Sequence, residues 1–259
     1  MKKTMISICV GAAAVAFTAA AVDGVWTAGS GVWTNTAMWA DGVLPDSGGT
    51  ASFLGNGGTV TVPGGYPFTL SALLVNTNGA NLTRTITGET NTLIAPATVR
   101  VDAYNFFLAS PLSGTDGLQK TGDGTLVLTV PNPLLSGSVQ ALGGRVLIAA
   151  DSHLGQVPAS YQTNAVVLDN ASFGNDDATV TLAETRGVTL GANGGYLFGR
   201  NLNQLVMASP VTGAGPLYIM LQSGFVKLGN TNNAYTGDTV VGSTRSEEHT
   251  SELQSLAYL

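Results

Sequence analysis

The sequence predicts an all-β protein made of stacked coils, and three observations support this. Of its 259 residues, 34 are Gly and only 10% are charged. A helical protein covers its surface with Lys, Glu, Arg and Ala, so this composition favours strands and turns. Short apolar runs alternate with turn residues, and similar strings recur far apart in the chain. No Pro/Ser linker or block of charge divides the sequence, so one continuous body is expected.

The composition also excludes several classes of protein. The formal net charge of −6 does not suit a nucleic-acid binder, which needs a basic stripe to displace counterions. One Cys and two His are too few for a multi-Cys zinc site or a histidine metal centre. We therefore expect no metal, no cofactor and no nucleic-acid partner.

Residues 1–21 are predicted to be a signal peptide. Lys2 and Lys3 precede an apolar stretch at 5–17, and Ala residues at 19–21 offer small side chains for cleavage. About 17 apolar residues are short for a membrane span, which makes cleavage the better interpretation. The prediction is export to the extracellular space or the outer-membrane surface.

Residues 22–244 show the pattern of strands and turns. Asn-Gly pairs at 56–57, 78–79 and 193–194 tolerate positive φ and mark turns. Short runs rich in apolar residues, bounded by turn residues, predict strands at 59–62, 97–101, 125–129, 145–148, 165–168, 179–182 and 187–190.

A long internal repeat favours stacked coils over a closed barrel. Residues 111–114, Pro-Leu-Ser-Gly, match residues 210–213, Pro-Val-Thr-Gly, at an offset of 99. At an offset of 100, the Gly, Leu, Asn and Gly residues of 124–137 meet those of 224–237. Self-similarity over such a distance is typical of solenoids, whereas a barrel does not require it.

The string at 117–128, Gly-Leu-Gln-Lys-Thr-Gly-Asp-Gly-Thr-Leu-Val-Leu, resembles the autotransporter-associated β-strand repeat. Its usual form is Gly-Leu-x-Lys-x-Gly-x-Gly-Thr-Leu-x-Leu, followed by Asn-x-Tyr-x-Gly. The second copy carries the tail as Asn-Ala-Tyr-Thr-Gly at 233–237, but departs from the motif at 224–228, Gly-Phe-Val-Lys-Leu. The motif residues are Gly117, Leu118, Lys120, Gly122, Gly124, Leu126, Leu128, Gly224, Leu228, Tyr235 and Gly237.

The resemblance covers nearly all of residues 22–244. It implies a right-handed parallel β-helix, with an N-terminal cap and first coils at 22–110 and repeat-bearing coils at 111–244. It further implies a structural or adhesive passenger at the cell surface. Its expected partners are host or environmental glycans or surface proteins, and it would reach the outer membrane through a missing C-terminal region.

Residues 245–259 look foreign to this pattern. The string Arg-Ser-Glu-Glu-His-Thr-Ser-Glu-Leu-Gln-Ser at 245–255 resembles the translation of a sequencing-adapter oligonucleotide. We interpret 245–259 as an artefact, so the β-helix is expected to be truncated at its C-terminal end. The alternative is a genuine charged tail.

No catalytic residue is predicted, although a β-helix enzyme acting on polysaccharide is the alternative function. Glycosidases need two carboxylates about 5–10 Å apart, and Asp176-Asp177 is the only adjacent acidic pair within residues 22–244, with Arg186 and Arg200 following. Asn175 and these two Asp lie between predicted strands, where such residues commonly form turns. His153 has no obvious catalytic partner and is expected to be a surface or turn residue.

Trp26, Trp33 and Trp39 support a third function, a carbohydrate-binding module. Indole faces can stack on sugar rings, so these residues are candidate carbohydrate contacts. The competing interpretation is that they bury a large apolar area and fill the first coil of the cap.

Overall fold

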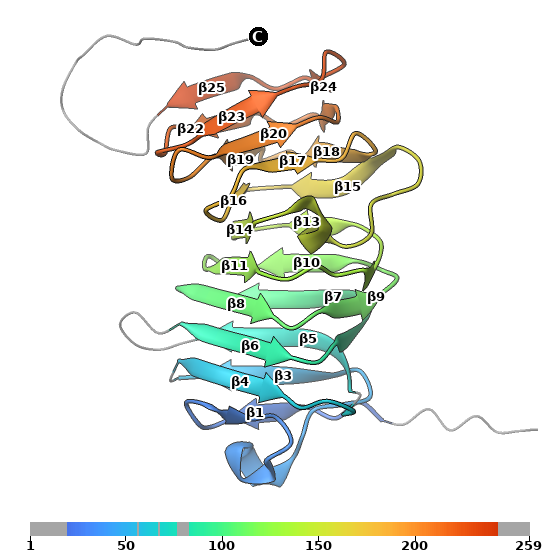
Figure 1. The fold of residues 1–259 in the computed structure, drawn as a ribbon, viewed down its shortest axis with the longest axis vertical. Coiled ribbons are helices and arrows are strands. Elements are labelled where there is room, and N and C mark those ends of the chain that lie inside the picture. Colours follow the sequence, from blue (N-terminus) through green and yellow to red (C-terminus); the bar gives the residue numbers. More distant parts are fainter. Residues whose placement is uncertain (1–19, 56, 67, 77–82, 243–259) are drawn as a thin grey trace, which may run out of the picture.

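The computed structural model describes residues 20–55, 57–66, 68–76 and 83–242. The predicted signal segment up to residue 19, the foreign-looking stretch 245–259, Asn56 and the pair at 78–79 lie outside the described residues. The described chain forms a parallel β-solenoid, drawn as an elongated rod in Figure 1. This confirms the predicted all-β class and the stacked coils. Within the described residues, no helix has the length and apolar character needed to cross a bilayer.

Two long sheets and one short sheet form the sides of the rod, and all hydrogen-bonded neighbours within them are parallel. The first sheet consists of β1 (Gly24–Trp26), β3 (Gly49–Leu54), β5 (Thr69–Asn76), β7 (Asn91–Val101), β10 (Leu118–Thr121), β13 (Val139–Ala141), β15 (Gln162–Leu168), β18 (Arg186–Leu190), β21 (Val211–Gly213) and β24 (Ala234–Tyr235), with β9 (Leu112–Gly114) and β12 (Leu134–Leu135) beside this path.

The second sheet consists of β2 (Gly31–Val32), β4 (Gly58–Val62), β6 (Arg84–Gly88), β8 (Asn105–Ala109), β11 (Thr125–Leu128), β14 (Gly144–Ile148), β16 (Ala171–Asn175), β19 (Gly195–Phe198), β22 (Leu217–Met220) and β25 (Thr239–Gly242). The third sheet consists of β17 (Val180–Leu182), β20 (Gln204–Met207) and β23 (Phe225–Leu228). Three 3₁₀ turns complete the described elements: η1 (Thr36–Met38), η2 (Ala40–Gly42) and η3 (Asp151–Leu154).

The coil spacing can be read from residues that lie one above another in the first sheet. Such a column runs through Leu118, Val139, Val166, Val188 and Val211. Successive members of this column are 21 to 27 residues apart. In the second sheet the spacing runs from 20 residues, between Thr125 and Arg145, to 29 residues, between Gly31 and Val60. The number of residues per coil varies because only the strands must stack, while the turns between them can differ in length.

The sequence repeat predicted the coils correctly, but its offset is not the structural period. The matched strings at 111–114 and 210–213 fall on β9 and β21, and β21 stacks in the column of β10 rather than of β9. Likewise β11 belongs to the second sheet, whereas β23, its counterpart at an offset of 100, belongs to the third. The two copies of the motif therefore occupy different positions around the circumference of the rod.

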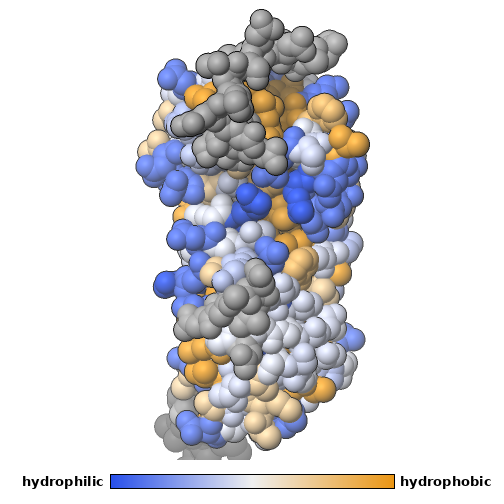
Figure 2. All heavy atoms as spheres, turned by 90° about the vertical axis from the view of Figure 1, so that its left-hand side faces the viewer, coloured by the Kyte–Doolittle hydropathy of each residue, from blue (hydrophilic) through white to orange (hydrophobic). Residues whose placement is uncertain are grey.

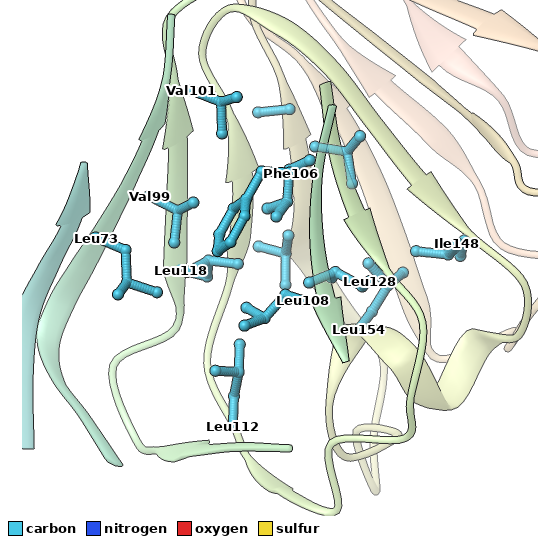
Figure 3. Packing of buried hydrophobic residues seen from close by; sticks show 14 of the residues in the cluster. Leu73, Val99, Val101, Phe106, Leu108, Leu112, Leu118, Leu128, Ile148 and Leu154 are labelled. Atoms are coloured by element: carbon cyan, nitrogen blue, oxygen red, sulfur yellow. The ribbon is translucent and has the colours of Figure 1, made fainter. Parts of the chain in front are cut away.

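The core lies between the sheets and is built from inward-pointing positions of the strands. Successive side chains of a strand point to opposite faces, so alternate residues of each coil enter the core. Figure 3 shows Val99, Phe106 and Leu118 pointing toward one another from the two long sheets, and all three are buried. Because every coil adds a similar layer, the apolar core is continuous along the rod.

The three Trp form the N-terminal end of this core. Trp26 and Trp33 have no exposed surface, and Trp39 is 3% exposed. The Trp39 ring lies edge-on to both others, at centroid distances of 5.1 Å from Trp26 and 4.9 Å from Trp33. Trp33 also stacks on Phe68, with centroids 4.3 Å apart. This placement supports the interpretation that they fill the first coil, and it leaves almost no ring face on which a sugar could stack.

The repeat motif provides core residues and tight turns. Leu118, Leu126 and Leu128 are buried, while Leu228 and Tyr235 are partly buried against the core. Gly117 and Gly122 have φ values of 82° and 76°, which non-glycine residues rarely adopt. At Gly117 an added Cβ would also lie 2.0 Å from the carbonyl oxygen of Ser138 in the next coil. Gly124, Gly224 and Gly237 likewise lie against the backbone of a neighbouring coil.

Lys120 is a buried cation that ties these turns together. Its Nζ donates to the carbonyl oxygens of Thr121 at 2.8 Å, Gly122 at 2.7 Å and Gly143 at 3.2 Å. Three carbonyls can use all three protons of an ammonium group. Burial lowers the pKa of Lys120 to about 8, against the opposing influence of Asp123 and Asp102.

We therefore expect the protein to become more stable, not less, as the pH rises above about 8. In this range the folded chain releases the Lys120 proton while the unfolded chain, with an ordinary pKa of 10.5, still binds it. Between pH 8 and 9.5 the free energy of unfolding should rise by about 2 kcal/mol. Urea unfolding followed by circular dichroism measures this, and Lys120→Met provides the control. A rise of the same size in that variant would show that another group is responsible.

Candidate functional site on the outer face of the second sheet

The outer face of the second sheet carries a column of apolar residues. Simple alternation of inward apolar and outward polar residues would not predict it. Phe107, Val127 and Leu147 lie one above another on β8, β11 and β14, and the column continues through Gly174 to Phe198. Their strand neighbours, such as Leu126 and Leu128, occupy the core on the opposite face. Val127, Leu147 and Phe198 are nevertheless 1%, 4% and 0% exposed, with Phe107 and Met220 packed against them.

Gly174 and Arg145 position the Phe198 ring over this column. A Cβ at Gly174 would lie 2.4 Å from Cε2 of Phe198, so the ring occupies the space that a side chain would take. The Arg145 guanidinium lies over the same ring, with its Cζ 4.8 Å from the centroid. Such cation–π contacts favour a partly desolvated guanidinium. The result is a second small apolar cluster outside the core.

A parallel column of polar and aromatic residues runs beside the apolar one. Register places Thr125, Arg145, Ser172, Tyr196 and Tyr218 on successive strands of the second sheet. The two tyrosine rings stack at a centroid distance of 4.5 Å and an angle of 16°. This column gives the face hydrogen-bonding groups next to the apolar surface.

Between the two columns lies a hollow in the surface with a volume of about 490 Å³. The floor includes Phe107, Val127 and Leu147, and the polar residues around it are Asn105, Thr125, Arg145, Asp176, Asp177, Arg200 and Gln222. Figure 2 shows a surface of this character in the upper half of the rod, where orange apolar atoms lie recessed between strongly hydrophilic blue ones.

The charges around the hollow are unevenly paired. Arg200 contacts both adjacent carboxylates, with Nη1 3.0 Å from Oδ1 of Asp176 and Nη2 3.9 Å from Oδ1 of Asp177. Within the described residues, no carboxylate comes within ion-pair distance of Arg145. Burial lowers the pKa of Arg145, and the nearby charge of Arg200 lowers it further. A guanidinium stays charged at neutral pH, so one positive charge in the hollow has no acidic partner.

Asp176 and Asp177, the acidic pair considered for catalysis, therefore line the hollow, but both contact Arg200. Asp177 has a φ of 55°, as expected for the predicted turn, and its Oδ1 also accepts a hydrogen bond from Nδ2 of Asn201. Arg186 does not join this group. It is 1% exposed and binds Asp151 instead, with Nε 2.9 Å from Oδ1.

His153 lies in a turn, one of the two positions expected for it, but it is buried rather than at the surface. It lies in η3 and is 6% exposed, with Nδ1 2.6 Å from the carbonyl oxygen of Leu128. The 3₁₀ turn packs onto the previous coil, which is why a turn residue enters the core here. Among the described residues, no group of three or more His, Cys, Asp or Glu side chains is placed to hold a metal ion.

Sequence reasoning did not identify Arg145 or the outer apolar column. One signal was present: residues 106–108, 126–128 and 146–148 are continuous apolar runs rather than alternating ones. A continuous run indicates a strand covered on both faces. It did not reveal that the outer cover would come from Phe198, a residue two coils further along.

Together these features define a parallel β-solenoid that presents a recessed, partly apolar flank to solvent. Over an alignment of 249 residues, the chain is 33% identical to the adhesin BmaC autotransporter of Brucella suis biovar 1 (strain 1330). The alignment covers 88% of this chain but only 7% of the length of that protein. No family model matches the chain, and no solved structure matches it. The chain is thus a homologue of an autotransporter adhesin, in agreement with the resemblance found in its repeat motif.

Proposed function

We propose that this chain is a segment of a surface-displayed adhesive passenger and acts by binding rather than by catalysis. The observation that carries the proposal is the homology to an autotransporter adhesin over most of the chain, on a solenoid fold. A stacked rod suits this role because each coil adds outward-facing side chains without changing the core. The proposed location is the extracellular or outer-membrane surface.

The arrangement of the acidic residues also favours binding over hydrolysis. A glycosidase needs one carboxylate to donate a proton and another to act as base or nucleophile. Asp176 and Asp177 both contact Arg200, so the two carboxylates serve as partners of one guanidinium rather than facing each other across an open cleft. The proposed partners are host or environmental glycans or surface proteins.

Adhesion is tested by coating beads with the purified protein and counting their attachment to host cells and to glycan-coated surfaces. We expect attachment several-fold above that of beads coated with the same protein after heat denaturation, because the binding surface exists only in the folded rod. Attachment no higher than this control on every surface would contradict the proposal. Release of reducing ends from a polysaccharide, lost in an Asp176→Asn/Asp177→Asn variant, would favour the enzyme instead.

A further inference from the structure

We propose that the hollow beside Arg145 binds an acidic sugar, namely a hexuronate unit of a carboxylated glycan. This inference rests on the proposed adhesive function and deepens it by naming a ligand class and a site. The hollow offers one cation without an acidic partner, an apolar floor and a polar rim, and each of these features corresponds to one part of such a sugar.

The first feature is the charge of Arg145. Asp176 and Asp177 are both within 4 Å of Arg200, whereas none of the described carboxylates approaches Arg145 to that distance. Asp123 lines a smaller adjoining hollow with Arg145 but forms no ion pair with it. A guanidinium presents a planar fork of donors that matches the two oxygens of a carboxylate. The stack on Phe198 holds this fork in place before a ligand arrives.

The second feature is the composition of the floor and rim. Of the apolar lining residues, Phe107 is only partly buried and can offer ring surface to the C–H face of a pyranose, while Val127 and Leu147 pack against it as buried support. Asn105, Thr125 and Gln222 supply amide and hydroxyl groups within reach of the same space, as sugar hydroxyls require. A volume of about 490 Å³ falls in the range of small-molecule sites.

The surrounding charge argues against a long, densely charged polyanion such as nucleic acid. The chain has a formal net charge of −6, and Asp123, Asp176 and Asp177 border the two hollows. A ligand that places one carboxylate at Arg145 gains the ion pair, whereas a continuous line of charges would meet these aspartates. A uronate with neutral hydroxyls on its other positions fits this pattern.

The test is isothermal titration of the purified protein with an aldotetrauronate, a tetrasaccharide with one hexuronate unit on three neutral sugars, and with its methyl ester, which has the same skeleton without the charge. We expect the acid to bind at least tenfold more tightly than the ester. Arg145→Gln should weaken binding of the acid at least tenfold, and Arg145→Lys should weaken it less. Arg100→Gln is the matched control, because Arg100 is 58% exposed and already paired with Asp102, and it should bind like the wild type.

A second variant separates loss of the site from loss of folding. Asn105→Trp keeps Arg145 but fills the hollow from an exposed rim position, and it should also abolish binding while the melting temperature stays unchanged. Three results would each overturn the proposal: equal affinity for the acid and the ester, an affinity of Arg145→Gln for the acid equal to that of the wild type, or a higher affinity of the wild type for a sulfated tetrasaccharide than for the acid. A wild-type protein that adheres to cells but does not bind the aldotetrauronate would overturn this ligand and leave the adhesive function standing.

Discussion

Replacing Trp33 with Ala is expected to lower the free energy of unfolding by about 3–5 kcal/mol, because it opens a large cavity at the N-terminal end of the core. Trp33 has no exposed surface, and its ring contacts Trp39, Phe53 and Phe68 at centroid distances of 4.9, 6.0 and 4.3 Å. The loss should appear as a lower midpoint in urea unfolding measured by far-UV circular dichroism. Since the rod is stacked coil on coil, the damage should begin at the cap.

Trp33→Phe separates packing from the polar part of the indole. The Nε1 of Trp33 is buried and has no hydrogen-bond partner among the described residues, so its removal costs no hydrogen bond. We expect a loss below about 1.5 kcal/mol for this aromatic replacement. A Trp33→Ala variant as stable as the wild type would show that the cap does not stabilise the rod. If that variant also lost glycan binding, the carbohydrate-platform hypothesis would gain support.

Replacing Asp151 with Ala is expected to cost about 3–5 kcal/mol, because it leaves a buried guanidinium without its counter-charge. Arg186 is 1% exposed, and it contacts Asp151 through Nε at 2.9 Å and Nη2 at 3.3 Å. Its remaining hydrogen bonds go to the carbonyl oxygens of Leu154, 3.5 Å from Nη1, and of Gly155 and Gln156, both 3.1 Å from Nη2, and carbonyls cannot neutralise the charge. Thermal and urea unfolding of the variant measure the loss.

The matched control is Asp102→Ala, which breaks the exposed pair between Arg100 and Asp102. Nε of Arg100 lies 2.6 Å from Oδ1 of Asp102, so the contact is at least as short, yet Arg100 is 58% exposed. Solvent can replace the lost carboxylate there, so the expected cost is much smaller than that of Asp151→Ala. Similar losses in the two variants would mean that burial does not govern the strength of the Asp151 pair.

Much of the fold could be predicted from the sequence, because strands carry a local signal. The runs at 59–62, 125–129 and 145–148 all fall on strands, namely β4, β11 and β14. The motif Gly117 and Gly122 correspond to positive φ values, which only a glycine adopts without strain. The all-β class and the stacking of coils follow from such local patterns and from their repetition.

The candidate site could not be predicted in the same way, because its parts are brought together only by the register of the coils. Arg145, Phe198 and Asn105 lie far apart in the sequence, and nothing in their local strings marks them as neighbours. The pairing of Asp176 with Arg200 rather than Arg186 depends on which side of the rod each strand occupies.

The sequence by itself determined that this protein is a β-solenoid built from Gly-rich turns and apolar strands, and it indicated a surface passenger through its repeat motif. Only the tertiary structure decided how the coils are aligned: stacked residues are 20 to 29 positions apart, and the similar strings 99 or 100 residues apart do not stack in the same columns of the rod. The physical reason is that strand formation depends on local alternation and turn chemistry. Register, by contrast, depends on which distant side chains fill the same layer of the core.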